Sequence, residues 1–391
     1  RALTSCTSNF KYMKNLMNIL RDTRIAIPLG FLLGLELFLQ TGLYKSLMQP
    51  RSYADNVNRI LRMAGQDKDP QALILGTSVA YQGIQVPELN ELLKKDAITV
   101  ESGACEGAKL ETQHLIMRAL LDRMPHVKTV IHVVEASHPG TARFHQDQAN
   151  RSMAAQFPRM EALHVLKSHN LKLEPSDYVY FFVRSITYQK DMRDFVLDPL
   201  DRFKGIGRRF REKPTGYIYE NKYEYKLSAF PAKNPIECVE VATRANIEQM
   251  GKEVTDQHHR NAVVRTCQIV LMDPLAGSGN AQWTALFFQR LKVMYKDITD
   301  RGIKIIVVFS PYSDVIKDLN AEYRIGEWQN GLAAITAREN YTTVDLRKSL
   351  DGPRNGDYYY DTIHLNREGA TVFTKALADA IRPILLKNTA R

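Results

Sequence analysis

A chain of 391 residues that is 44% hydrophobic and 25% charged has the composition of a globular protein with a full core, which excludes a disordered polypeptide. Its net charge of +10 favours anionic neighbours such as phospholipid headgroups, acidic polysaccharide or nucleic acid. Nucleic acid is the least favoured of these, because the sequence has no zinc-finger spacing, no aromatic RNA-binding motif and no basic heptad region.

The chain begins with a basic tail that leads into an apolar segment. Residues 1–24 hold five Arg or Lys side chains and a single acidic one, and residues 25–43 are almost wholly apolar. That length suits a bilayer core, and the basic flank favours a cytoplasmic N-terminus. We therefore expect a single-pass cell-membrane protein with tail and signal-anchor helix in residues 1–44 and the rest extracytoplasmic, in the periplasm or outside the cell. A buried core helix is the alternative, and Glu36 is expected to face a partner helix or lie near the interface.

Residues 45–70 predict a stalk, and a regular pattern starts after Pro70. Short apolar segments alternate with helical stretches, which predicts parallel strands with crossover helices. The expected strands are 72–75, 98–101, 130–134, 304–309 and 343–346, and the expected helices are 107–123, 281–300, 320–338 and 366–386. The predicted fold class is α/β, a three-layer α/β/α arrangement with a five-stranded parallel sheet whose site opens at the carboxyl ends of the strands.

The alternation fails in the middle of the chain. This divides it into a core of residues 71–139 and 280–391 and an insertion or lid subdomain of residues 140–279. A helix is expected from Met153 to Lys167, followed by an aromatic run at residues 178–182. The alternating tyrosines Tyr217, Tyr219, Tyr223 and Tyr225 predict a hairpin whose aromatic face either stacks on sugar rings or packs onto the core. Arg208 and Arg209 belong to a basic cluster that either contacts an acidic polymer or headgroups, or is simply solvated.

The cysteines Cys6, Cys105, Cys238 and Cys267 show no metal-binding spacing, and neither a metal nor another cofactor is expected. Only the last two lie in one region. The sequence leaves open a bridge between them in an oxidising compartment and a pair of buried free thiols.

Two polar segments at opposite ends of the core contain candidate catalytic residues. Ser78 follows the first strand and Gly76, and its own N–H is expected to point at an oxyanion. Asp361 precedes His364 by three residues, just before the last helix, so its carboxylate can hold one ring nitrogen and leave the other to act as a base. Both segments are expected at the same sheet edge. Gly103, after the second strand, is the expected second oxyanion donor.

Gly76-Thr77-Ser78, Gly103 and Asp361-x-x-His364 together resemble the SGNH (GDSL-like) hydrolases. The membrane segment and the insertion are similar to the branch that partners membrane-bound O-acyltransferases, which includes alginate O-acetylation and D-alanylation proteins. The resemblance implies a flavodoxin-like fold with Ser78 as nucleophile, His364 as general base, Asp361 as its orienter and Gly103 as an oxyanion donor. The family's Gly-x-Asn-Asp after the third strand is replaced here by residues 135–139, so Ser137 or His138 is expected to supply the missing donor.

The sequence thus predicts a membrane-anchored serine esterase or O-acyltransferase that adds or removes acetyl groups on a cell-envelope or exported polysaccharide through an acyl-serine. The expected partners are the acylated polysaccharide or acyl donor, a membrane-bound O-acyltransferase, and the membrane itself. Tyr312, after the fourth strand, is expected to border the crevice and contact substrate. An α/β-hydrolase is disfavoured, because there the acid follows a separate strand well before the histidine. The alternative is a catalytically degenerate glycan-binding or scaffold protein of an envelope complex.

Overall fold

A computed structural model describes residues 22–50, 52–63, 69–135, 148–171, 173–211, 223–230, 232–234, 236–238, 240, 257–272, 281–317 and 321–389. The chain divides into two compact units. The N-terminal unit comprises residues 1–52 and 173–211, and the sheet unit comprises residues 53–172 and 212–391. Part of the predicted insertion therefore groups with the apolar N-terminal segment and the rest groups with the sheet.

The sheet unit contains five parallel strands, which confirms the predicted α/β class and the parallel sheet. The strands are β1 (Ala72–Leu75), β2 (Val100–Ser102), β3 (Thr129–Val134), β4 (Lys304–Phe309) and β5 (Tyr341–Asp345). Their order in the sheet is β2-β1-β3-β4-β5, the order of flavodoxin-like folds. In this order the carboxyl end of β1 lies between the ends of β2 and β3.

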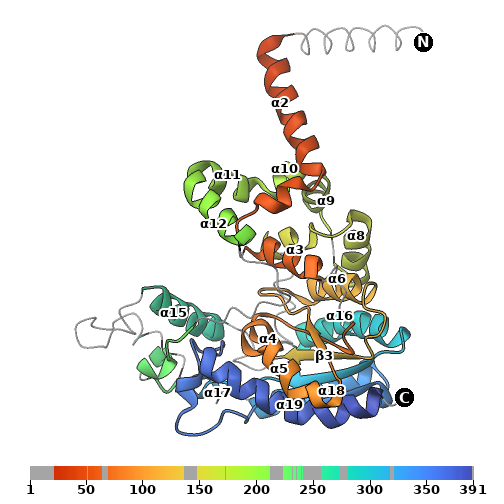
Figure 1. Ribbon diagram of the computed structural model, residues 1–391, viewed down its shortest axis with the longest axis vertical. Helices are drawn as coiled ribbons and strands as arrows, with labels where there is room; N and C mark the ends of the chain where they lie inside the picture. Colours follow the sequence, from red (N-terminus) through yellow and green to blue (C-terminus); the bar gives the residue numbers. More distant parts are fainter. Residues whose placement is uncertain are drawn as a thin grey trace. The chain divides into compact units, whose positions relative to one another are not determined.

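Strands β1, β2 and β3 are buried on both faces, as parallel strands usually are, whereas the edge strand β5 is partly exposed. Every residue of β1 and β3 is buried. Ala72 and Ile74 belong to a core cluster with side chains of α5 (Val86–Leu93) and α19 (Arg367–Thr389), and these two helices contact each other. A second set of contacts joins α6 (Leu110–Leu121), α16 (Ala281–Asp300) and β4. Figure 1 shows α5 and α19 together beside the sheet. These contacts position the ends of the strands.

Other helices complete the sheet unit. The short helices α4 (Ser78–Gly83) and α17 (Asp314–Lys317) follow β1 and β4. Further helices of this unit are α3 (Tyr53–Met63), α7 (Gln148–Ala154), α8 (Arg159–Ser168), α15 (Gln257–Met272) and α18 (Ala321–Ile335). Helix α3 lies in the predicted stalk but contacts α6 and α7, with Val57 and Ile60 buried. This part of the segment is therefore core rather than spacer.

The predicted element boundaries are shifted at several places for local reasons. Strand β2 starts two residues later than expected, at Val100, where its pairing with Ala72 of β1 begins. Helix α6 starts at Leu110 rather than 107, because Gly107 also has a positive φ of 68°. The expected helix from Met153 to Lys167 is interrupted, since Pro158 stands as the N-cap of α8.

The N-terminal unit is helical throughout its described residues. Among the described residues, one helix is long and apolar enough to cross a membrane, namely α2 (Thr23–Gln40). Its mean hydropathy is 1.4, and 6% of it is buried. After it come η1 (Leu43–Leu47) and, from the second segment, α9 (Pro175–Phe182), α10 (Arg184–Thr187), α11 (Gln189–Leu197) and α12 (Pro199–Arg211). The aromatic run at residues 178–182 forms most of α9.

Candidate active site

Ser78 stands where β1 turns into α4. Gly76 makes this turn possible, because a side chain on it would place a Cβ 2.5 Å from the Cβ of Ala80. Thr77 is the N-cap of α4, and its hydroxyl oxygen accepts a hydrogen bond from the N–H of Val79 at 3.4 Å. The half-buried Ser78 side chain is thereby held at the carboxyl end of the strand, as the sequence predicts.

Asp361 and His364 lie in the loop before α19. One oxygen of the buried Asp361 carboxylate, Oδ1, accepts the N–H groups of Ile363 at 2.9 Å and His364 at 2.8 Å. The other, Oδ2, lies 2.8 Å from Nδ1 of His364. A carboxylate can only accept, so the proton in this contact belongs to Nδ1 and the second ring nitrogen is left as an acceptor.

The two ends of the core meet at that nitrogen. Nε2 of His364 lies 2.8 Å from Oγ of Ser78, across 286 residues of sequence. Hydroxyl, imidazole and carboxylate form one continuous chain of hydrogen bonds at the sheet edge. This is the geometry of a nucleophile, a general base and its orienting acid.

The charge on His364 is set by its surroundings. Burial favours the neutral ring, but the negative charge of Asp361 and its hydrogen bond, together with the charges of Glu135 and Glu106, raise the pKa of His364 to about 8. Its side chain is still 19% exposed, so a substrate can reach it. A pKa near 8 leaves the ring mostly protonated at neutral pH and makes its neutral form a moderately strong base.

Gly103 does not have the predicted role of oxyanion donor. Its N–H donates to the carbonyl oxygen of Ile74 at 2.8 Å, within the continued pairing of β2 with β1. The residue is a glycine for a packing reason, because a Cβ there would lie 2.7 Å from Cδ1 of Leu120 and 3.0 Å from Cγ2 of Ile116. The Ser78 N–H, by contrast, finds no acceptor in the part of the chain that the structure describes. Ser137 and His138 lie outside the described residues.

Polar residues that the sequence reasoning missed surround the triad. Thr77 Oγ1 donates to Oε1 of Glu135 at 2.9 Å, at the carboxyl end of β3. Glu106, after β2, accepts from Nε2 of Gln82 at 2.6 Å and from Nδ2 of Asn56 at 3.4 Å. The available signal was their position, since each carboxylate follows a strand that neighbours β1. They add negative charge beside His364.

The loop that carries Asp361 and His364 is fixed on one side by residues 223–230. The N–H of Leu227 donates to the carbonyl oxygen of Tyr359 at 2.8 Å, and the N–H of Arg367 donates to that of Tyr223 at 2.9 Å. The rings of Tyr223 and Tyr360 stack with centroids 3.9 Å apart. This contact shows that Tyr223 packs beside the triad loop. Tyr217 and Tyr219 lie outside the described residues.

Helix α15 fixes the same loop from another side. Nε2 of the buried His259 donates to the carbonyl oxygen of Tyr360 at 2.6 Å, and Oγ1 of Thr266 accepts the N–H of Thr362 at 3.4 Å. Ser313, from the loop after β4, donates its hydroxyl to the carbonyl oxygen of Thr362 at 2.7 Å. Both peptide groups of Thr362, between the acid and the base, are therefore hydrogen-bonded.

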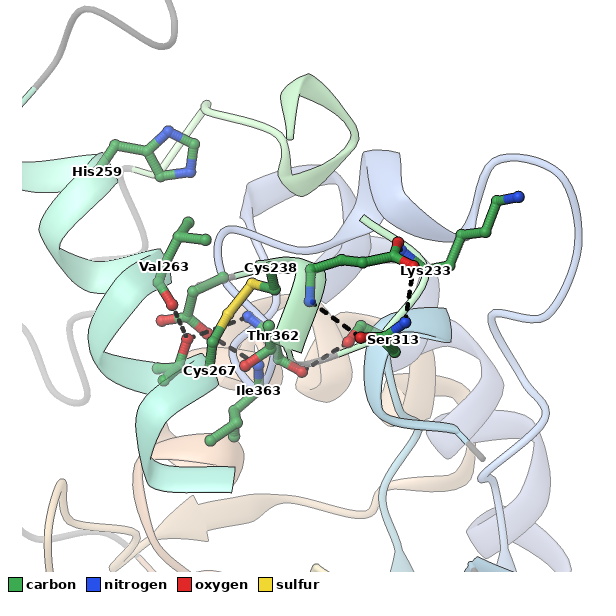
Figure 2. Close-up of a disulfide and its surroundings, with 12 residues drawn as sticks. Lys233, Cys238, His259, Val263, Cys267, Ser313, Thr362 and Ile363 are labelled. Atoms are coloured by element: carbon green, nitrogen blue, oxygen red, sulfur yellow. Dashed lines mark hydrogen bonds between the residues drawn. A yellow bond between two sulfur atoms is a disulfide. The ribbon is translucent and has the colours of Figure 1, made fainter. Parts of the chain in front are cut away.

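A disulfide reinforces this arrangement. Cys238 and Cys267 are bonded, with their Cα atoms 6.1 Å apart, and Cys267 belongs to α15. Figure 2 shows the bridge beside Thr362 and Ile363. Of the two alternatives that the sequence left open, the structure has the bridge. Cys105 is a buried free thiol, and Cys6 lies outside the described residues.

The remaining predicted contact residues are spread over the molecule. Tyr312 is half-buried in the loop after β4, and its carbonyl oxygen accepts from Nδ2 of Asn355 at 3.1 Å. Arg208 and Arg209 lie on α12 of the N-terminal unit. A depression of about 270 Å³ has lining residues that follow His364 closely in the sequence, and others from the segment that begins at Tyr223. They are Tyr223, Glu224, Lys226, Asn366, Arg367, Glu368 and Thr371. No group of three or more His, Cys, Asp or Glu side chains among the described residues is placed to hold a metal ion.

Comparison with known proteins adds no relative. No protein-family model matches the chain, and no curated protein matches it. The candidate site is therefore defined by the geometry of Ser78, His364 and Asp361.

Proposed function

We propose that this protein is a membrane-anchored serine esterase or O-acyltransferase of the SGNH type. The observation that carries the proposal is the unbroken series of contacts from Ser78 Oγ to His364 Nε2 and from His364 Nδ1 to Asp361, at 2.8 Å each. Such contacts are what acyl transfer through a serine requires. A sheet set between two helical layers, with a lid formed from those parts of residues 140–279 that group with the sheet unit, belongs to the same proposal.

The proposed reaction starts with proton transfer from the Ser78 hydroxyl to Nε2 of His364 while Oγ attacks an ester carbonyl. The oxygen of the tetrahedral intermediate takes up negative charge. The backbone N–H of Ser78, at the start of α4, can donate a hydrogen bond to that oxygen and stabilise it. As the carbon–oxygen bond to the leaving alcohol breaks, the imidazolium returns its proton to that alcohol. An acyl group is then left on Ser78.

The second half repeats these steps with a new acceptor. His364 takes a proton from water or from a sugar hydroxyl, whose oxygen attacks the acyl-serine and releases Ser78. Water gives an esterase and a sugar gives a transferase, so the acceptor decides the outcome. Asp361 keeps the proton on Nδ1 throughout and stabilises the imidazolium.

Several features support an extracytoplasmic site that acts on a polysaccharide. A disulfide in the sheet unit fits an oxidising compartment. The apolar α2 and its basic flanking sequence fit an anchor with a cytoplasmic N-terminus. Tyr223 lines the depression described above, where an aromatic ring can stack on a sugar, while the cations Lys226 and Arg367 of its lining are paired with Glu368 and Glu224. The membrane-bound O-acyltransferase partner is part of the proposal on the resemblance alone.

The proposal is tested with p-nitrophenyl acetate and the full chain in detergent micelles. The wild-type protein is expected to release p-nitrophenol, and Ser78→Ala is expected to reduce that rate to the level of buffer. Ser168→Ala is the matched control, because the Ser168 hydroxyl donates only to its own helix, to the carbonyl of Val165. Equal activity of Ser78→Ala and wild type would refute the assignment. A folded wild-type protein without activity would favour the glycan-binding or scaffold alternative.

A further inference from the structure

The N-terminal unit exposes large apolar side chains outside α2. At the junction of α11 and α12, the exposed fractions are 79% for Val196, 74% for Leu197, 74% for Leu200 and 58% for Phe203. These four exposed side chains lie within eight residues, and we call them the α11–α12 tip. Exposed apolar clusters on a folded protein usually mark a surface that is covered in the cell.

The helices α9 and α10, which precede the tip in the sequence, are hydrogen-bonded to the last turns of α2. The carboxylate of Glu36 accepts the N–H of Arg184 at 2.7 Å and the N–H of Ser185 at 2.8 Å. Nε2 of Gln40 donates to the carbonyl oxygen of Phe182 at 3.0 Å. The junction of α9 and α10 is therefore fixed beside the C-terminal end of α2.

The tip itself is tied to the segment that follows α2. Asp191 of α11 accepts the hydroxyl of Tyr44 at 2.6 Å and the N–H of Gln49 at 3.0 Å. Arg202 of α12, whose side chain is 1% exposed, donates to Asp191 at 2.9 Å and to the carbonyl oxygen of Leu47 at 3.1 Å. A buried ion pair with these additional hydrogen bonds holds α11 and α12 against residues 44–49.

The position of α2 in a bilayer then fixes the level of the tip. An α-helix of 18 residues spans roughly 27 Å, close to the thickness of the hydrocarbon core. Its end at Gln40 must lie near one membrane surface, and the bonded partners Tyr44, Leu47 and Gln49 follow within a few residues. The tip is thus held near the headgroups of that leaflet.

The charge of this region complements an anionic surface. Residues 189–211 contain seven Arg or Lys and four Asp side chains, and Asp191 is already paired with Arg202. Lys190, Arg193, Lys204 and Arg208 are exposed on these two helices, together with three of the Asp side chains, and the balance over residues 189–211 is basic. Exposed apolar side chains on helices with an excess of basic residues are typical of the membrane interface.

We propose that the α11–α12 tip inserts into the headgroup region of an anionic phospholipid leaflet, the leaflet from which α2 emerges. The inference rests on the membrane anchoring in the proposed function, and it is independent of the esterase chemistry. It adds a second membrane contact, which would limit rotation of the N-terminal unit about the axis of α2.

Site-directed spin labelling of the full chain in liposomes that contain phosphatidylglycerol tests the proposal. Nitroxides are placed by Leu197→Cys and by Leu200→Cys, each in a Cys6→Ser background, since Cys105 is buried and the other two cysteines are bonded. Collisions with oxygen, which concentrates in lipid, are compared with collisions with a water-soluble nickel chelate. Met160→Cys on α8 is the aqueous control because Met160 is 72% exposed in the sheet unit, and Leu33→Cys reports on α2.

The expected result is an oxygen-to-nickel collision ratio several-fold higher at positions 197 and 200 than at 160. The ratio should fall at both positions in the Lys204→Glu, Arg208→Glu variant and in liposomes of phosphatidylcholine alone. A high ratio at position 33 with a low ratio at position 197 would overturn the proposal but not the membrane anchor. Low ratios at both positions would overturn the anchor as well. Labels at 197 and 200 that collide with neither reagent would overturn the proposal and show that a protein partner or a second copy of the chain covers the tip.

Discussion

The two units of this protein place their apolar side chains in opposite ways. In the sheet unit, the strands β1 and β3 are fully buried, and large apolar side chains are concentrated in the core. In the N-terminal unit, α2 buries only Leu39. Outside α2, this small unit exposes Leu43, Val179, Phe182, Ile186, Val196, Leu197, Leu200 and Phe203, whereas the described part of the much larger sheet unit exposes Tyr53, Met160, Tyr223, Ile236, Val372 and Leu386.

The difference in exposed apolar side chains indicates different surroundings for the two units. Burial of apolar side chains is favourable only when the alternative is water. The sheet unit meets that condition and forms a conventional core. The N-terminal unit buries a few apolar side chains, such as Phe181 and Tyr188, and adds polar contacts such as that of Asp191 with Arg202, but it leaves many large apolar side chains exposed. This exposure suits the membrane anchoring proposed above.

A matching pair of carboxylates sharpens the comparison. Glu36 in the N-terminal unit and Asp361 in the sheet unit each accept two backbone N–H groups. Only Asp361 also contacts a histidine ring. The first carboxylate joins helices, and the second organises a loop and holds the His364 ring, which the proposed mechanism uses as a base.

The largest expected effect separates these two carboxylates. Asp361→Asn should lower kcat for p-nitrophenyl acetate by about 10⁴-fold, because an amide no longer holds the proton on Nδ1 of His364. Glu36→Gln should leave kcat unchanged in detergent micelles. Steady-state kinetics of both variants check this. Asp361→Asn with activity within tenfold of wild type would remove Asp361 from the mechanism.

Polar substitutions should affect the stability of the two units differently. Ile131→Asn places an amide in the middle of β3, where the side chain is fully buried, and should cost about 4 kcal/mol of unfolding free energy. Leu197→Asn should change it by less than about 0.5 kcal/mol, since the side chain is exposed. Guanidinium unfolding of the full chain in detergent measures both. Equal losses would show that Leu197 is a core residue.

The disulfide should stabilise the triad loop. The bridge joins residues 29 positions apart, so its removal in the Cys238→Ser, Cys267→Ser variant should cost roughly 3 to 4 kcal/mol by loss of the cross-link. Activity should fall as well, because α15 then holds Tyr360 and Thr362 less firmly. A reductant should reproduce both effects in wild type and have none in the double variant. Full activity without the bridge would mean that the loop is held by its hydrogen bonds alone.

The smallest expected effect is the dependence of activity on pH. His364 acts as a base only when neutral, so with a pKa of about 8 the value of kcat/KM should rise roughly 100-fold from pH 6 to pH 9. The same raised pKa stabilises the folded protein fully below about pH 6.5, and that contribution is lost as the pH rises through 8. A flat rate profile over this range would exclude His364 as the base.

The sequence was sufficient for the parts that depend on topology. Ser78 and His364 could be placed together because parallel strands bring their carboxyl ends to one edge, and this follows from the order of elements. The role of Gly103 could not be judged, since it depends on whether one N–H is used in strand pairing. The residue after Ser102 continues that pairing with Ile74.

Residues that act through tertiary contacts were also beyond the sequence. Nothing in the pattern near His259 or Thr266 indicates that α15 packs on the loop around Thr362. Likewise, Glu106 and Glu135 became site residues only once the neighbouring strands were known. The grouping of residues 173–211 with α2 has the same cause, because Glu36 and Asp191 join segments almost 150 residues apart.

The central claim is that Ser78 carries the acyl group. Acid quenching of the full chain during turnover of p-nitrophenyl acetate, followed by peptide mass spectrometry, tests it directly. The mechanism predicts one acetyl group on the peptide that contains Ser78, and its absence in His364→Gln. Acetylation elsewhere with an unmodified Ser78, in a protein that turns over the ester, would contradict the account.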